Sequence, residues 1–283
     1  MIKAKKIAFF YYTIQSHRYN MTKGGFPMPE LRQIQSEQLT VRVFDTRADM
    51  GAAAAEHAAE MIRTVAAQKD EINIIFAAAP SQNEFLACLR AMTDLPWDRV
   101  NAFHMDDYIG LPADAPQGFA NFLRRSIFDH VPFGHVYCMN GQNPDPADEC
   151  ARYTQLLREH PADIIFMGIG ENGHIAFCDP PVADFFDPLD VKVVELEGRC
   201  RQQQVNDGCF PTLDEVPTHA YSLTIPLMMR VPHMMLVAPT ALKAQAILGT
   251  VRGPITTDVP ASIVRIHKTG ATLYTDEAGV SLL

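Results

Sequence analysis

The stretch ADIIFM, residues 162–167, contains the clearest strand signal in this chain. Its run of apolar residues is typical of a strand that is buried on both faces of a sheet. EINIIFAA (71–78) and RVNAFHM (99–105) predict two further strands of the same kind. Longer helical patterns lie between the strands, and this alternation is typical of a parallel sheet covered by helices.

The order of elements therefore predicts an α/β fold, a three-layer Rossmann-like domain whose mainly parallel sheet is covered by helices on both faces. Ser81 with Glu84 forms a capping-box pattern that opens the second helix. The predicted helices are Asp49–Lys69, Ser81–Met92, Gln117–Asp129, Asp145–His160 and Thr240–Val251, and the further strands are Val136–Met139, Lys192–Leu196, Tyr221–Ile225 and Met234–Ala238. No linker divides the chain, so we expect residues 41–283 to form a single domain and residues 1–40 an N-terminal extension of uncertain role.

Composition excludes several classes of protein. The chain has 283 residues, with 24 Lys+Arg against 33 Asp+Glu and a formal charge of −9, which argues against general binding to nucleic acid. The six cysteines show no CxxC pair, which indicates reduced thiols in a cytoplasmic protein. The apolar run Ile7–Ile14 is too short for a membrane span and has no cleavage site after it, so we expect neither export nor a membrane partner.

Polar residues that follow the strands are the candidates for chemistry, because ligands of such sheets bind outside the carboxyl ends of the strands. Three stretches qualify, APSQNE (79–84), MDDYIGL (105–111) and GIGENGHIAFCDPP (168–181), and all three should open at the same edge of the sheet. The last one matches GxGxxG, but Pro180 and Pro181 prevent the helix that a dinucleotide site needs after Gly173. The glycines instead predict a tight turn that lets His174 and Asn172 point into a ligand crevice.

Two segments, FHMDDYIGLP (103–112) and MGIGENGHIAFCDPP (167–181), resemble the signatures of the glucosamine-6-phosphate deaminase/isomerase family, which is related to the 6-phosphogluconolactonases. The resemblance extends from about residue 41 to the end of the chain. It implies that Asp106 transfers a proton between carbons 2 and 1 of the opened sugar, and that His174 opens the ring. Two acidic partners of that histidine in the family correspond here to Asn172 and Asp179, of which Asn172 carries no charge.

The resemblance also implies a phosphate site. Ser81, at the start of its predicted helix, and Lys243, in APTALKAQA, correspond to phosphate-binding positions, although an ordinary N-cap role would predict the same serine. Arg201 is a second candidate cation, with Arg199 as its competitor. The polar segment Val182–Pro217 corresponds to a lid over the sugar, or to a surface insertion.

Together these features predict an amino sugar 6-phosphate isomerase/deaminase that forms a ketose 6-phosphate and ammonia without a cofactor. Its partner is a small-molecule sugar phosphate, and a homo-oligomer is possible. The alternatives are a sugar-lactone hydrolase like 6-phosphogluconolactonase and a non-catalytic sugar-phosphate sensor. A divalent metal held by His104, Asp106, Asp107, His174 and Asp179 is the less favoured interpretation, because no HxH or HxxxH spacing fixes two ligands on one element.

Overall fold

A computed structural model describes residues 30–283 of the chain. The apolar run Ile7–Ile14 lies outside these described residues. Among the described helices, none is both long enough and apolar enough to cross a membrane.

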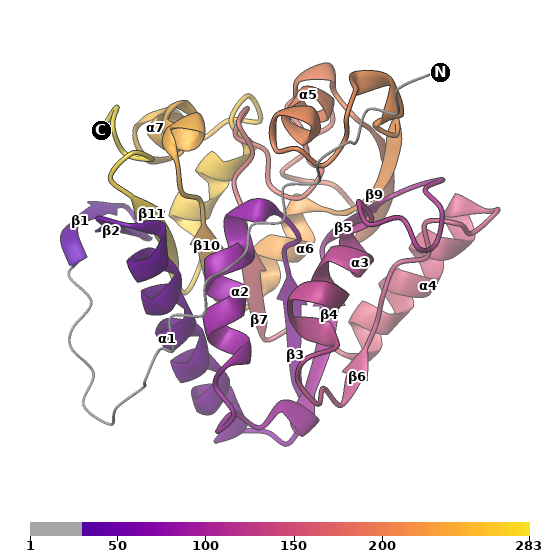
Figure 1. The fold of residues 1–283 in the computed structure, drawn as a ribbon, viewed down its shortest axis with the longest axis horizontal. Helices are drawn as coiled ribbons and strands as arrows, with labels where there is room; N and C mark the ends of the chain where they lie inside the picture. Colours follow the sequence, from indigo (N-terminus) through magenta and orange to yellow (C-terminus); the bar gives the residue numbers. More distant parts are fainter. Residues whose placement is uncertain (1–29) are drawn as a thin grey trace, which may run out of the picture.

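A sheet of eight strands runs through the molecule (Figure 1). Its strands, in spatial order, are β1 (Glu30–Ser36), β2 (Leu39–Phe44), β11 (Ala271–Asp276), β10 (His233–Val237), β7 (Ile164–Met167), β3 (Ile72–Phe76), β4 (Val100–His104) and β6 (His135–Val136). Strand β1 pairs antiparallel with β2, and every other pairing is parallel. The mainly parallel sheet predicted from the sequence is therefore confirmed.

Helices cover both faces of this sheet, as predicted. The helices are α1 (Arg47–Ala66), α2 (Asn83–Arg90), α3 (Phe119–Leu123, continued by a π-helical turn over Arg124–Phe128), α4 (Pro146–Glu159), α5 (Gly198–Asn206), α6 (Ile225–Arg230) and α7 (Ala244–Arg252). Figure 1 shows α1 and α2 side by side against one face. The side chains of α1, α2 and α3 pack on that face, and those of α4, α6 and α7 pack on the other.

Alternation along the strands creates these two cores. In β7, Ile164 and Phe166 belong to the core under α1 and α2, whereas Ile165 and Met167 belong to the opposite core. Because successive strand residues point to opposite faces, a strand between two helical layers is apolar at nearly every position, apart from polar residues that are paired, such as Asn73 and Asn101. This requirement explains why ADIIFM is so recognisable in the sequence.

A second sheet of three antiparallel strands, in the order β5 (Asp106–Tyr108), β9 (His219–Leu223) and β8 (Val191–Glu195), was not predicted. Two of its strands, β8 and β9, match the predicted strands Lys192–Leu196 and Tyr221–Ile225, for which no separate sheet was expected. Strand β5 follows β4 after the single residue Met105. The chain therefore leaves the main sheet at the point where MDDYIGL begins.

Three details of the sequence-based prediction are wrong. The expected boundary at residue 41 falls inside β2, and residues 30–40 belong to the main sheet; the polar strand β1 gives only a weak pattern because it lies at an edge and is partly exposed. Ser81 and Glu84 form no capping box, because α2 begins at Asn83 and Arg47 binds the Glu84 carboxylate at 2.7 Å. The segment Val182–Pro217 contains β8, which matches the predicted strand Lys192–Leu196, and also the helix α5, which was not predicted.

Candidate active site

A cavity of about 900 Å³ opens at the carboxyl ends of β3, β4 and β7. The loops after these three neighbouring strands contribute Ser81, Asp106 and His174 to its wall, so the three polar stretches meet at one edge of the sheet as predicted. Lys243, from the 3₁₀ turn before α7, lies in the same wall. The volume lies within the range of sites for small molecules.

Asp106 is a buried carboxylic acid in the wall of this cavity, with 6% of its surface exposed. Burial raises the pKa of Asp106 well above its ordinary range, and the carboxylates of Asp107 and Asp179 act in the same direction. A desolvated carboxylate is a stronger base than one in water, which suits proton abstraction from carbon.

Asp107 has a different role from its neighbour. Its carboxylate accepts the backbone N–H groups of Tyr108 and Phe119, both at 2.9 Å, and that of Ala120 at 3.0 Å. It therefore caps the start of α3 from outside the helix, where Gly118 at the N-cap position offers no side chain. Of the two adjacent acids, only Asp106 lines the cavity.

A buried polar network supports the turn that presents Asp106. The ring of His104 binds the carbonyl of Asp106 through Nδ1 and accepts the N–H of Met139 at Nε2, both at 2.9 Å. The hydroxyl of Tyr153 donates to the carbonyl of His104 and accepts its N–H. These bonds leave the His104 ring no free nitrogen for a metal, and Asp107 is equally occupied, so the five-residue metal set weighed above does not converge.

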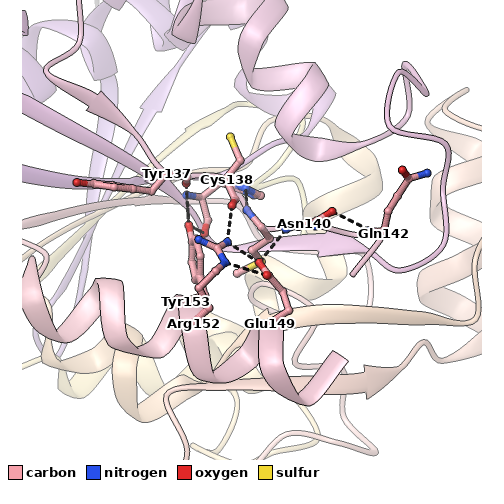
Figure 2. A network of polar contacts seen from close by, with 9 residues as sticks. Tyr137, Cys138, Asn140, Gln142, Glu149, Arg152 and Tyr153 are labelled. Atoms are coloured by element: carbon pink, nitrogen blue, oxygen red, sulfur yellow. Dashed lines mark hydrogen bonds and ion pairs between the residues drawn. The ribbon is translucent and has the colours of Figure 1, made fainter. Parts of the chain in front are cut away.

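Figure 2 shows the outer part of this network, in which side chains of α4 reach the segment that contains Tyr137 and Gln142. Arg152 binds the carboxylate of Glu149 and the carbonyl of Cys138, and Glu149 accepts the N–H of Asn140. Residues on α4 thus hold the segment that in turn fixes His104.

His174 lies against the fully buried carboxylate of Asp179. Nδ1 of His174 is 2.8 Å from Oδ1 of Asp179, a distance that suits an ion pair, although the contact lacks the geometry of a directed hydrogen bond. Burial by itself would raise the pKa of Asp179, but the His174 imidazole and the Asn172 amide outweigh it, so that the pKa lies below its ordinary value. Asp179 therefore stays ionised beside the ring.

Asn172 acts on the acid rather than on the ring. Its Nδ2 donates to Oδ1 of Asp179 at 2.9 Å, and its Oδ1 accepts the backbone N–H of His174 at 3.1 Å. Neither Asn172 nor Asp179 lines the cavity, so the prediction that Asn172 points into the crevice is wrong. The shorter side chain of Asp179 needs no bridging water, because the loop brings it into direct contact with the histidine.

The glycine turn makes room for the imidazole. No helix starts at Gly173, which has a positive φ of 85°, so the dinucleotide interpretation is excluded as expected. A Cβ atom at Gly170 would lie 2.2–2.4 Å from three atoms of the His174 ring. The ring therefore occupies the space that any other residue at position 170 would fill.

Ser81 and Lys243 form the polar part of another wall. Ser81 lies in the 3₁₀ turn Pro80–Gln82 and does not cap α2, so the ordinary N-cap role is excluded. The amide of Gln82 donates to its hydroxyl at 3.0 Å. Burial lowers the pKa of Lys243, while the carboxylates of Asp207 and Glu171 act in the opposite direction. No acid lies within ion-pair distance of Lys243 in the part of the chain that the structure describes.

Arg201 does not have the expected position. Its guanidinium donates to the carbonyls of Leu213 and Val216, at 2.7 and 2.9 Å, and it does not line the cavity among the described residues. The competing Arg199 is exposed and also lies outside the cavity wall. Arg201 therefore stabilises the loop that follows α5.

The sequence analysis missed several residues of the wall. Gln203 and Gln204 of α5, with Asp207 just after it, face the cavity, and Oε1 of Gln203 accepts the N–H of Glu171 at 2.8 Å. The spacing of Gln203 and Asp207, four residues apart, would place both on one face of a helix, but the sequence analysis considered only the arginines of this segment. Arg47 and Arg125 also line the cavity and bind the carbonyls of Pro80 and Pro116, respectively.

Comparisons with known proteins show the family to which the chain belongs. The family model described as glucosamine-6-phosphate isomerases/6-phosphogluconolactonase matches residues 45–184. A glucosamine-6-phosphate deaminase of Lactobacillus delbrueckii subsp. bulgaricus is 37% identical over 191 residues, which are 68% of this chain and 79% of that protein. One from Listeria monocytogenes is 35% identical over 213 residues, 75% of this chain and 88% of that protein.

Solved structures of two proteins have a fold similar to that of this chain. A monomeric glucosamine-6-phosphate deaminase superposes with a TM-score of 0.79 at 26% identity, covering 86% of this chain and 99% of that one. The 6-phosphogluconolactonase of Trypanosoma brucei gives a TM-score of 0.72 at 16% identity, covering 89% of this chain and 100% of that one, which shows a shared fold. With its sheet, its cavity and these relatives taken together, the chain belongs to the glucosamine-6-phosphate isomerase/6-phosphogluconolactonase family.

Proposed function

We propose that this chain is an amino sugar 6-phosphate isomerase/deaminase, which converts glucosamine 6-phosphate or galactosamine 6-phosphate and water into a ketose 6-phosphate and ammonia. One observation supports this proposal above all others. A desolvated carboxylic acid, Asp106, and an acid-paired imidazole, His174, line the same cavity although they are far apart in the sequence. The relatives named glucosamine-6-phosphate deaminase support the same reaction.

In the proposed first step, His174 takes the proton of the hydroxyl at carbon 1 and gives a proton to the ring oxygen, which opens the sugar. Asp179 stabilises the positive charge that the imidazole acquires during this transfer. Asn172 holds Asp179 in place and leaves the charge on the carboxylate.

In the second step, Asp106 removes the proton from carbon 2 and returns it to carbon 1. The double bond between carbon 1 and its oxygen is lost, and this oxygen takes a proton that the ammonium nitrogen gives up, so that carbon 1 carries a hydroxyl and carbon 2 an imine. Water adds to this imine, and ammonia leaves to give the ketose. The substrate carries an ammonium group on carbon 2, and a positive charge near Asp106 lowers the pKa of the acid toward the ionised form that a base requires.

Lys243 and Ser81 are the proposed ligands of the phosphate. Charge-assisted bonds from a buried lysine are strong, and the Ser81 hydroxyl is not used as a helix cap. Arg201 is not part of this proposal, because its guanidinium binds backbone carbonyls.

Isotope exchange tests the assignment. With Asp106→Asn, exchange of the carbon 2 proton with solvent deuterium should fall by roughly 10²- to 10⁴-fold, whereas substrate affinity should stay nearly the same. Asp114→Asn, the same change at an exposed aspartate of the following loop, serves as the control. Undiminished exchange in the Asp106 variant would refute the role of this acid.

Substrate screening tests the reaction itself. The wild-type chain should release ammonia from at least one of the two amino sugar 6-phosphates. Hydrolysis of 6-phosphogluconolactone without release of ammonia would favour a lactonase instead. Tight binding of the sugar phosphate without turnover would indicate a sensor.

A further inference from the structure

Cys200 of α5 lies beside the acid and the imidazole of the candidate site, and the proposed reaction does not use it. One ligand atom from each of His174, Asp179 and Cys200 lies within 4.8 Å of the others, and all three residues are buried. No other group of three such side chains meets this criterion within residues 30–283. Oδ2 of Asp179 is buried without a hydrogen-bond partner, and the buried Nδ1 of His174 has only its ion-pair contact with Oδ1 of Asp179.

We propose that His174, Asp179 and Cys200 form a site for a thiophilic divalent cation such as Zn²⁺, and that its occupation reversibly blocks the histidine. Zinc is commonly held by thiolate, imidazole and carboxylate ligands, with three protein ligands and an open fourth position. Because His174 lines the cavity, a metal can enter from that side, and a water molecule can fill the fourth position.

The geometry requires only a small adjustment. With zinc–ligand distances of about 2.0–2.3 Å in a tetrahedron, ligand atoms lie roughly 3.3–3.6 Å apart. The present separation between His174 and Asp179 is 2.8 Å, and no separation in the cluster exceeds 4.8 Å. Side-chain rotations that move the three ligand atoms by about 1 Å therefore bring them to the positions that zinc requires.

The charges also fit a divalent cation. The cluster sits in a negative region, because Asp106 and Glu197 lie near Cys200 in addition to Asp179. Burial and these acids raise the pKa of the Cys200 thiol well above its ordinary value, so without a metal the thiol keeps its proton. On binding, the thiol proton is released to solvent, and the two charges of the cation balance one thiolate and one carboxylate.

Cobalt provides a readout that does not depend on the reaction. Titration of the full-length chain with Co²⁺ should give a thiolate-to-cobalt charge-transfer band that saturates at one equivalent and is displaced by Zn²⁺. Cys200→Ser should lose the band and bind at least about 100-fold more weakly, since loss of even an outer-shell group costs up to that factor. Cys150→Ser on α4, at a half-buried thiol remote from the cluster, should keep the band.

A second variant tests the site even if Cys200→Ser does not fold. Asp179→Asn keeps the shape of the side chain and the thiol but removes one anionic ligand, so it should also weaken cobalt binding. No saturable binding in the wild-type chain, or an unchanged band in Cys200→Ser, would overturn the proposed site.

The inhibitory consequence rests on the proposed function, whereas the metal site does not. If the chain deaminates an amino sugar 6-phosphate, Zn²⁺ should inhibit the wild type, and a chelator should restore activity. Each variant is compared with its own metal-free rate, and inhibition of Cys200→Ser should require at least about 100-fold more Zn²⁺. A cobalt band in a chain without deaminase activity would support the metal site and contradict the proposed function. Deaminase activity without a cobalt band would support the function and contradict the metal site.

Discussion

Gly170 is the position where the structure makes the sharpest prediction about catalysis. The nearest ring atom of His174 would lie 2.2 Å from a Cβ at this position, and ordinary contact begins at 3.4 Å, so Gly170→Ala must displace the ring or the backbone by about 1.2 Å. A displacement of this size separates the imidazole from Asp179, now 2.8 Å away. Misplacement of a catalytic group by about 1 Å costs on the order of 10²-fold in rate.

The assay is kcat/KM for ammonia release, with circular dichroism to establish that the variant is folded. Gly198→Ala is the matched control, because a Cβ at that position meets no atom within 4 Å and Gly198 already lies in a helix. We expect roughly 10²-fold loss for Gly170→Ala and less than about threefold for the control. A folded Gly170→Ala variant with wild-type kcat/KM would refute the argument that the glycine exists to accommodate the histidine.

Three further predictions concern neighbouring residues. Burial raises the pKa of Asp106 in the folded state, so the unfolded chain loses this proton first as the pH rises above about 4. The free energy of unfolding then falls by about 1.4 kcal/mol for each pH unit between the unfolded and the folded pKa. Asp106→Asn should therefore melt at a higher temperature than the wild type at neutral pH, and the difference should vanish near pH 4. An equal melting temperature at pH 7 would contradict the burial argument. Asp107→Asn should lower the free energy of unfolding by about 1–3 kcal/mol in urea titrations, because an amide cannot accept all three backbone N–H groups; a loss below about 0.5 kcal/mol would show that the cap is unimportant. Lys243→Ala should raise KM for the 6-phosphate by about 10- to 100-fold but not for the unphosphorylated amino sugar, and equal effects on both would remove Lys243 from the phosphate site.

Much of this molecule follows from local sequence patterns. Apolar runs such as ADIIFM identify strands buried on both faces, and the parallel order of those strands places the residues after them at one edge. This is why the sequence alone predicts that Asp106, His174 and Ser81 lie at a common cavity. The glycine turn was likewise evident, because prolines at 180 and 181 exclude a helix there.

The tertiary structure decided what depends on partners distant in the chain. An arginine on α5 can face the cavity or bind backbone carbonyls, depending on where the following loop lies. Arg201 donates to the carbonyls of Leu213 and Val216 in that loop. Glu84 could not be recognised as a partner of Arg47, and the thiol of Cys200 reaches the His174–Asp179 pair only because α5 folds back over the edge of the sheet. Periodicity reports which face of an element is buried, but it carries no information about which side chain from another element will lie opposite.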